Sequence, residues 1–578
     1  MILQALVQEY EDLAALGKIA EPGWSLSRIS YCLCLNMEGQ LTQVISMKTE
    51  QQSGKKTALL PQNLKLPAPV KRTAGVCSNF LWDNATYLLG LDGKGKPERA
   101  KECFLACKTL HEKLLAEADT PAAKALLNFF NIWNPASATD HPILTGYMDD
   151  LLAGANLIFR VENTFLHTDP IICAIWQRYY DQVDPEISGI CMVTGQQTAP
   201  EQVHPSIKGV QGAQSSGAAL ISFNAPAFCS YSKEQNLNAP VGKYAAFAYT
   251  SALNHLLSDR RHISRIGDTT VIYWAVGGNS AYADAFSAFT WGSDTQYDEK
   301  DLRKIFLDLT QGKPVDFEHS RLDPETSFYI LGLAPNAARL SVRFFLQNSF
   351  GVFLRNVQAH YDRMEIVKPS YEKFTTIPPW KLLSETVNQN SRDKTPTPGM
   401  AGEVMRAILM NTSYPATLLN GVQLRIRAEQ KITWGRASIL KAYYTKCPHP
   451  DVPLEEVLTV SLNETSNNIP YILGRLFSVL EHIQTTANPG INSTIKDRYF
   501  NAASATPSRV FPTLINLAQK HLRKIGRRER DTFNEQLAQI LLPLNEEFPN
   551  HLNLPQQGAF QLGYYHQTQK RYGQKEEH

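Results

Sequence analysis

Several sequence signatures of common protein classes are missing from this chain of 578 residues. Its nine cysteines include no CxxC pair, so a zinc ribbon is not expected, and their odd number does not suit a disulfide framework. No run of about 18 uninterrupted apolar residues occurs, which argues against a transmembrane helix. The chain starts without a basic region or a cleavage site, so we expect no signal peptide. These absences predict a soluble, cytoplasmic protein with reduced thiols and no membrane partner.

Motifs for catalysis are equally scarce. The chain has no HExxH motif, no GxSxG nucleophile elbow and no GxGxxG fingerprint. The segment from Gly90 to Pro97 approaches a phosphate-binding loop, but proline stands where that loop needs a Ser or Thr hydroxyl for magnesium. Asp149 and Asp150 suit a metal-dependent nuclease, although paired aspartates at helix starts are common. We therefore expect no catalytic residue, no metal and no cofactor.

The composition that is present belongs to a folded protein of several domains. Apolar residues make up 43% and charged residues 19% of the chain, so large cores can form. At roughly 150 residues per domain, the length predicts two to four domains. The 57 basic and 55 acidic residues leave a net charge of +2. A total this small does not exclude nucleic acid as a partner, because local patches can still be strongly basic.

The first part of the chain mixes strand and helix patterns. Residues 1–370 are expected to form a mixed α/β domain, in which residues 29–35 and 41–46 make a hairpin. Further strands are expected at 157–161, 189–193, 219–223, 269–275, 328–333 and 340–345, the last two paired, and helices at 99–118, 171–180, 244–257, 302–311 and 352–365.

The pattern changes after residue 370. Residues 371–400 are polar and punctuated by proline, which is typical of a linker. From 401 to 578 strand patterns are absent, and apolar residues recur at three- and four-residue spacing, as at Ile469, Ile472 and Leu476. Helices with one apolar face pack as a bundle. The predicted fold class is α+β, with a mixed α/β N-terminal region followed by an all-α C-terminal helical bundle.

Basic residues gather in the predicted bundle. Between residues 496 and 530, nine Lys and Arg residues face two acidic ones, a local balance of 9 − 2 = +7. Such a patch attracts a phosphate backbone, although solvated helix faces explain it as well. The backbone-binding candidates are Arg425, Arg427, Lys496, Arg498, Lys520, Arg523, Lys524, Arg527 and Arg528.

Two further tracts suit close approach to a ligand. Residues 204–219 are rich in glycine and small polar side chains, which let backbone N–H groups come near phosphates or base edges. The plainer interpretation is a connector into a strand at 220–223. In residues 71–84 a basic pair precedes a glycine turn and an amide-bearing segment. The candidate side chains of the two tracts are Lys71, Arg72, Asn79, Lys208, Gln214, Ser215 and Ser216.

Three stretches resemble a known family, the large subunit of the type I-C CRISPR effector complex, Cascade. The first is Asn79-Phe80-Leu81-x-Asp83-Asn84-x-x-Tyr87-x-Leu89-Gly90. The second runs from Cys191-Met192-Val193-Thr194-Gly195 through His204-Pro205-x-Ile207-Lys208-Gly209-Val210 and Gly212-Ala213-Gln214-Ser215-Ser216-Gly217-Ala218 to Ser222-Phe223-Asn224. The third is Gly474-Arg475-Leu476-Phe477-Ser478-Val479-Leu480-Glu481. Together with the length and the mixed-then-helical layout, the resemblance covers essentially the whole chain.

The resemblance implies a non-catalytic subunit in RNA-guided DNA interference. Its N-terminal domain would dock in the complex and read a protospacer-adjacent motif in double-stranded target DNA, while CRISPR RNA supplies sequence discrimination. The subunit would aid duplex opening and R-loop formation and help recruit a helicase-nuclease. Its other partners would be the backbone subunits, the subunit at the 5′ handle and the small subunit of Cascade.

The resemblance also implies roles for the candidate residues. Lys71, Arg72 and Asn79, or Lys208 with Gln214, Ser215 and Ser216, would contribute to motif readout or strand separation. The basic residues of the bundle would hold the displaced strand without sequence preference. Residues 460–578 resemble the small subunit, and we treat an internal translation start near Val460 as a hypothesis.

Two other function classes remain open at this point. One is a metal-dependent nuclease that uses Asp149 and Asp150. The other is a helical scaffold that binds only proteins. Cleavage by the isolated chain would support the first, and a salt-sensitive interaction with duplex DNA would disfavour the second.

Overall fold

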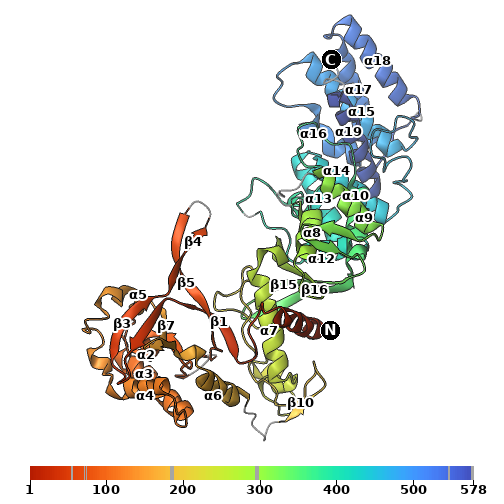
Figure 1. Ribbon diagram of the computed structural model, residues 1–578. Coiled ribbons are helices and arrows are strands. Elements are labelled where there is room, and N and C mark those ends of the chain that lie inside the picture. Colours follow the sequence, from red (N-terminus) through yellow and green to blue (C-terminus); the bar gives the residue numbers. More distant parts are fainter. Residues whose placement is uncertain are drawn as a thin grey trace. The chain divides into compact units, whose positions relative to one another are not determined.

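The computed structural model describes residues 1–53, 56–70, 72, 75–181, 188–292, 299–392, 394–544 and 547–573. They form two compact units (Figure 1). Unit 1 consists of residues 1–207 and 221–255, and unit 2 of residues 208–220 and 256–578. Within the described ranges, no helix is long and apolar enough to cross a membrane.

A five-stranded sheet forms the centre of unit 1. Its strand order is β3 (Leu41–Ser46), β2 (Tyr31–Leu35), β7 (Asn156–Val161) and β6 (Trp82–Asn84), with β8 (Thr164–Phe165) beside β7. The predicted hairpin is confirmed, because β2 and β3 pair antiparallel. One face of the sheet packs on α3 (Pro97–Leu115) and α4 (Pro121–Ile132), whose phenylalanines fill the core. Every residue of β2 is buried, as expected for a strand covered on both faces.

The other face of this sheet is covered by a second, three-stranded antiparallel sheet. Its order is β1 (Trp24–Ile29), β5 (Lys56–Pro67) and β4 (Lys48–Ser53). Ile29 and Leu66 pack against Cys32, Trp82 and Ile158. The rest of unit 1 consists of α1 (Ile2–Ala15), α2 (Ala85–Leu88), α5 (Met148–Leu152), α6 (Pro170–Asp181), β9 (Gly189–Ile190), β10 (Gln197–Thr198) and the larger part of α7 (Lys243–Ser258).

Unit 2 begins with a four-stranded antiparallel sheet. Its order is β11 (Ile263–Ile266), β12 (Thr269–Ala275), β15 (Ser327–Asn336) and β16 (Arg339–Ser349). The predicted pairing of residues 328–333 with 340–345 is confirmed by the register of β15 and β16. One face of the sheet shares a core with α8 (Ala281–Trp291), α9 (Glu299–Thr310) and α10 (Phe350–Met364), and β13 (Val315–Phe317) pairs with β14 (Ser320–Leu322).

The strand predicted at residues 219–223 does not form. Ala219 makes an isolated bridge with Arg339, and the residues after it are irregular. The preceding tract turns repeatedly, because Gly209, Gly212 and Gly217 adopt φ values of +92°, +77° and +101°. These left-handed conformations suit glycine and break the extended path that a strand needs.

Helices make up the remainder of unit 2. They are α11 (Pro379–Ser384), α12 (Met400–Leu409), α13 (Ala416–Glu429), α14 (Trp434–Lys446), α15 (Ile469–Ala487), α16 (Ile495–Ala505), α17 (Pro507–Leu522), α18 (Arg527–Leu541) and α19 (Leu554–Gly573). In the described part of the chain no strand follows Ser349, so the predicted α+β class with a helical C-terminal region is confirmed.

The helical region shares one core with the sheet of unit 2. Buried side chains connect without interruption from Ile266 to Tyr565. Leu382 and Leu383, on α11 inside the expected linker, are part of this core. The compact units divide at residues other than 371–400. The functional boundary that the sequence predicts at 371–400 is a separate matter and stays a prediction.

α15 and α19 approach each other backbone to backbone. A Cβ at Gly474 would lie 1.9 Å from the carbonyl oxygen of Phe560, and one at Gly563 would lie 2.1 Å from that of Tyr471. Only glycine allows this approach, which explains Gly474 at the start of the third stretch that carries the family resemblance.

Candidate nucleic-acid interface

The tract from Lys208 to Leu220 belongs to unit 2 and is anchored at both ends on the sheet of that unit. Near its start, the backbone N–H of Gln211 donates to the Thr270 hydroxyl at 3.1 Å. Near its end, the N–H of Ala219 donates to the carbonyl of Ala338 at 3.0 Å, and the N–H of Leu340 donates back to Ala219 at 2.9 Å. The tract is therefore a fixed loop that crosses from β12 to the β15–β16 turn.

The middle of this loop is exposed. Lys208, Gln214, Ser215 and Ser216 all have exposed side chains. Turns within the loop are closed by backbone bonds from Ala213 to Val210, at 3.2 Å, and from Gly217 to Gln214, at 2.9 Å. Gln214, Ser215 and Ser216 are thus exposed together on one backbone turn, and Lys208 is exposed near the start of the same loop.

Two arginines that the sequence analysis missed flank the same loop. Arg265 is exposed on β11 and pairs in register with Thr270, the residue that anchors Gln211. Arg339 pairs with Ala219 at the other end. Both are isolated in sequence, so only the pairing of the strands could have linked them to the loop. A third arginine of this sheet, Arg343, is paired with Asp268 at 2.6 Å.

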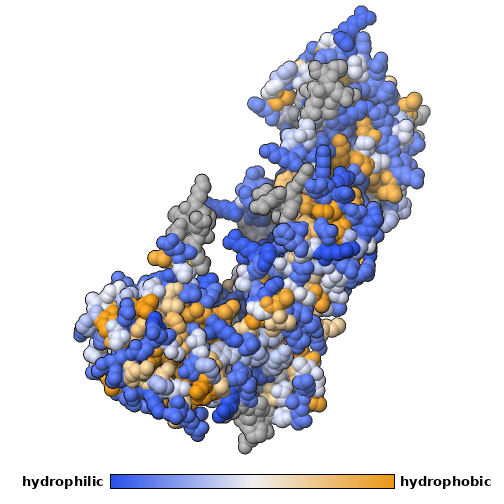
Figure 2. Space-filling model, in the orientation of Figure 1, coloured by the Kyte–Doolittle hydropathy of each residue, from blue (hydrophilic) through white to orange (hydrophobic). Residues whose placement is uncertain are grey.

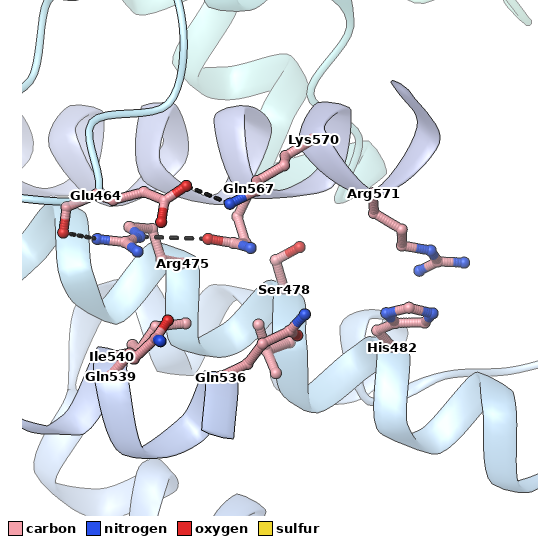
Figure 3. A pocket seen from close by; sticks show the side chains of 11 residues that line it. Glu464, Arg475, Ser478, His482, Gln536, Gln539, Ile540, Gln567, Lys570 and Arg571 are labelled. Carbon is pink, nitrogen blue, oxygen red and sulfur yellow. Dashed lines mark hydrogen bonds and ion pairs between the residues drawn. The ribbon is translucent and has the colours of Figure 1, made fainter. Parts of the chain in front are cut away.

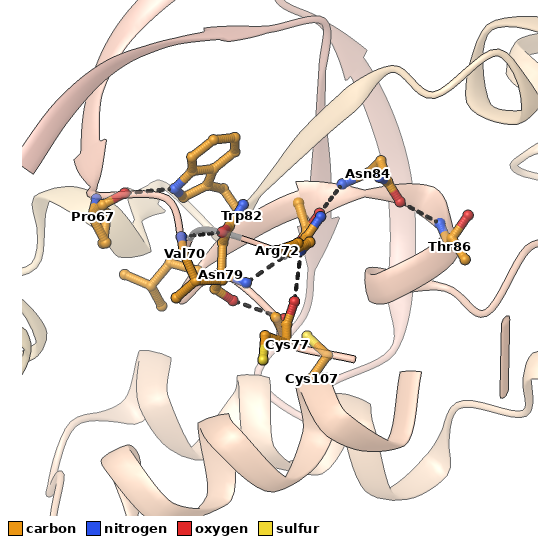
Figure 4. A network of polar contacts seen from close by, with 12 residues as sticks. Pro67, Val70, Arg72, Cys77, Asn79, Trp82, Asn84, Thr86 and Cys107 are labelled. Atoms are coloured by element: carbon orange, nitrogen blue, oxygen red, sulfur yellow. Dashed lines mark hydrogen bonds and ion pairs between the residues drawn. The ribbon is translucent and has the colours of Figure 1, made fainter. Parts of the chain in front are cut away.

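Arg72 lies in unit 1 at the centre of a polar network (Figure 4). Its Nε donates to the carbonyl of Cys77 at 2.7 Å, its Nη2 pairs with the carboxylate of Asp83, and its guanidinium lies 3.9 Å from the centre of the Tyr87 ring. Asp83 is 2% exposed, whereas 30% of the Arg72 side chain is exposed. Burial raises the pKa of Asp83, and the Arg72 charge and the N–H of Asn79 act in the opposite direction.

Asn79 belongs to the same network. Its side chain is buried, and its Oδ1 accepts a hydrogen bond from the N–H of Val70 at 3.0 Å. Its own N–H donates to Asp83 at 3.0 Å. Asn79 therefore connects Val70 and Asp83 from inside. Lys71, predicted beside Arg72, lies outside the described residues.

The predicted nuclease candidate Asp150 is occupied by contacts within unit 1. Its carboxylate pairs with Lys48 at 2.5 Å and accepts a hydrogen bond from the Tyr31 hydroxyl. These two bonds lower the pKa of Asp150. No group of three or more potential metal ligands occurs among the residues that the structure describes.

Basic side chains gather where α17 ends and α18 begins. Lys520, Arg523, Lys524, Arg527 and Arg528 are all exposed there, and we call this group the basic corner. Lys524 donates to the Asn488 side chain at 3.3 Å, and Arg527 pairs loosely with Asp531 at 4.0 Å. In the space-filling view this end of the chain, on the face drawn, is predominantly hydrophilic (Figure 2).

Three of the other four predicted backbone-binding residues make contacts within the helical bundle. Arg425 pairs with Glu429 at 3.6 Å and Arg427 donates to Gln557 at 2.8 Å. Lys496 lies with its Nζ 4.9 Å from the centre of the Tyr564 ring, and burial lowers its pKa. Arg498 is exposed beside Tyr499.

A second basic surface was missed by the sequence analysis. Lys300, Arg303 and Lys304 lie on α9, where they line a shallow depression with Lys313. Acidic neighbours in the sequence, among them Asp301 and Asp308, hide this group from a count of charges. The helical spacing of the three bases was the signal that could have revealed it.

Comparison with known proteins identifies the family. The model of a family described as CRISPR-associated protein (Cas_Csd1) matches residues 6–572. No curated protein matches the chain. The match extends over nearly all of both units, including the loop from Lys208 to Leu220, the Arg72 network and the basic corner. The chain therefore belongs to the Cas_Csd1 family of CRISPR-associated proteins.

Proposed function

We propose that this protein is the non-catalytic large subunit of a type I-C Cascade. In this role it recognises the protospacer-adjacent motif in double-stranded target DNA, aids duplex opening and R-loop formation, and helps recruit the helicase-nuclease. CRISPR RNA and the other Cascade subunits are its partners in the complex. The observation that carries the proposal, beyond the family itself, is the exposed and anchored loop with Gln214, Ser215 and Ser216 at its centre.

The chemistry of this loop suits readout of a short motif. A glutamine amide can donate and accept at once, so Gln214 can make a bidentate contact with the edge of adenine in the major groove. The two serine hydroxyls and Lys208 offer contacts to bases or phosphates. Because both ends of the loop are bonded to the sheet, little ordering entropy is lost on binding.

The Arg72 network has a different part in this proposal. Asn79 is buried, so it acts by holding Val70 and Asp83 in place. Arg72 keeps part of its side chain exposed and is the residue of this network that DNA can reach.

The basic corner holds the displaced strand in this proposal. Five exposed cations on two adjoining helix ends attract phosphates without reading bases. α15 to α19 all lie within residues 460–578, the segment that resembles the small subunit, and its separate production from an internal start near Val460 remains part of the hypothesis. Mass spectrometry of the purified complex tests this directly, since absence of a fragment beginning near Val460 contradicts it.

Motif readout is tested with the assembled complex and duplex targets whose flanking motif is randomised. We expect Gln214→Ala to weaken binding to the preferred motif by about 1–3 kcal/mol and to relax motif choice at one position. Gln347→Ala is a matched control, because Gln347 is exposed on β16 in the same unit. The proposal fails if Gln214→Ala and a Ser215→Ala/Ser216→Ala double variant both keep the motif choice of the control.

A further inference from the structure

A polar pocket of about 200 Å³ lies among three helices of the C-terminal bundle. Figure 3 shows side chains from α15, α18 and α19 along this space, with Arg475 at one end and Arg571 and His482 at the other. Arg475, Ser478 and His482 come from α15, Gln536 and Gln539 from α18, and Gln567, Lys570 and Arg571 from α19. All the lining residues fall between Glu464 and Arg571, within the segment that resembles the small subunit.

One wall of the pocket is held rigidly. The glycine contacts between α15 and α19 fix the distance between these helices. Arg475, 5% exposed, donates from Nε to the Gln567 side chain at 3.3 Å and from Nη1 to the carbonyl of Glu464 at 3.1 Å. Ser478 shares a hydrogen bond with Thr568 at 2.8 Å. These bonds are made before any ligand binds, so the wall is pre-organised.

The lining carries an excess of positive charge. Three cations, Arg475, Lys570 and Arg571, face one carboxylate, Glu464, which gives a formal charge of 3 − 1 = +2. Lys570 and Glu464 neutralise each other in an ion pair, so the two guanidinium groups carry the remaining charge.

Arg571 is the group that points most directly to a ligand. Its Nε is buried and has no hydrogen-bond partner among the described residues. The other two cations of the lining are already bonded, Arg475 to Gln567 and Lys570 to Glu464. Arg571 lines the pocket, so an anion there would offer acceptors to its guanidinium group.

The size of the pocket limits what this anion can be. Sites for drug-sized ligands occupy about 300–1,000 Å³, so a pocket of about 200 Å³ takes a single group and not a whole nucleotide. Guanidinium, hydroxyl and amide donors on opposite walls suit the several oxygens of a phosphate better than the two of a carboxylate.

The position of α18 selects a nucleic acid as the source of the phosphate. α18 begins with Arg527 and Arg528 of the basic corner and continues to Gln536 and Gln539 in the pocket. From Arg528 to Gln536 the helix rises by about 12 Å, since each residue adds 1.5 Å. A few nucleotides of one strand span this length.

We propose that this pocket binds one backbone phosphate of the displaced single strand, with the guanidinium group of Arg571 as its main ligand. The inference rests on the proposed function, in which the basic corner already holds that strand. It adds a defined contact to an otherwise diffuse electrostatic surface.

The test measures binding of the full chain to an oligothymidine and to an abasic oligonucleotide of the same length, over a series of salt concentrations. Arg571→Gln removes one charge without breaking a bond among the described residues. Gln539→Glu adds a carboxylate to the opposite wall from an exposed position, where folding is not at risk. Arg406→Gln is the matched control, because Arg406 is exposed on α12 and does not line the pocket.

We expect both pocket variants to bind either oligonucleotide about tenfold more weakly than the control, the size of one lost charge-assisted hydrogen bond. Arg571→Gln should also reduce the slope of log K against log salt by about 0.7, as one phosphate contact on a single strand predicts. Equal affinity and slope in the pocket variants and the control would overturn the inference. A loss of affinity for the oligothymidine alone would also overturn it. The same holds if an acidic peptide displaces the abasic strand at the concentration at which competing DNA does. None of these results involves the motif in duplex DNA, so the Gln214 experiment succeeds or fails independently.

Discussion

Replacing Arg72 with methionine tests whether this residue braces the fold, contacts DNA, or does both. The substitution keeps an unbranched side chain and removes the charge opposite Asp83, which is 2% exposed. Breaking a buried ion pair from one side costs about 3–5 kcal/mol, because the other charge stays buried. Arg72 is 30% exposed and Asp83 keeps its bonds from Asn79 and Asn84, so we expect the lower end, about 3 kcal/mol.

The loss should depend on pH in a defined direction. Burial holds the folded-state pKa of Asp83 above its ordinary value, so ionised Asp83 destabilises the fold. This penalty is absent below the unfolded-state pKa and complete above the folded-state pKa. Removing Arg72 raises the folded-state pKa further. The deficit of Arg72→Met should therefore be largest near neutral pH and shrink as the pH falls through that value.

Urea unfolding measures the stability deficit of Arg72→Met at each pH. Amide hydrogen exchange of residues 77–84 reports the local opening of that segment. The double variant Arg72→Met/Asp83→Asn carries no buried charge and should recover most of the lost stability. If it stays as unstable as Arg72→Met, or if Arg72→Met loses no protection at neutral pH, the bracing role is wrong. A DNA-binding measurement then separates the two roles of Arg72. If the double variant recovers its affinity for DNA, Arg72 acts as a brace; if the affinity stays low, Arg72 contacts the DNA directly.

Two further perturbations follow from the structure. Glu9 on α1 is 1% exposed, neither of its carboxylate oxygens has a hydrogen-bond partner among the described residues, and burial raises its pKa to about 8. The free energy of unfolding should fall as the pH rises from the ordinary pKa of a glutamate carboxyl towards 8. Glu9→Gln should remove this pH dependence and be more stable than the parent at pH 9 by several kcal/mol, since each pKa unit is worth about 1.4 kcal/mol. Equal unfolding curves of the two proteins at pH 9 would contradict this. In the basic corner, Arg523→Gln/Lys524→Gln should flatten the salt slope for single-stranded DNA by about 1.4 whatever its sequence, and a loss confined to one sequence would exclude simple phosphate contacts.

Local patterns predicted much of the fold. The β2–β3 and β15–β16 hairpins and the helix α15 follow from alternation or helical spacing within short windows. The strand predicted at 219–223 did not form, because beyond the bridge from Ala219 these residues pair with no strand among the described residues, and composition alone does not show whether a segment finds a partner strand.

The candidate site was less accessible to such reasoning. The exposed loop at residues 208–217 is contiguous, so small side chains and glycines were enough to find it. The pairing of Arg72 with Asp83 joins residues in a loop and a strand, and the burial of Lys496 over Tyr564 depends on α19 folding back. The pocket needs three helices to meet, and no sequence window contains all of them.

The start of α18 gives a separate physical reason to regard the basic corner as functional. Lys520, at the end of α17, lies where a helix dipole favours positive charge. Arg527 and Arg528 occupy the first turn of α18, where the dipole disfavours it by about 0.3–1 kcal/mol each, and Gly526 supplies no side-chain cap. Only Glu529 opposes them in that turn. A helix selected for stability alone would begin with acidic residues, so these two arginines weaken the fold locally. Departures of this kind are expected where a surface is kept for binding, and the phosphate backbone that we propose as the partner would turn the excess charge into affinity.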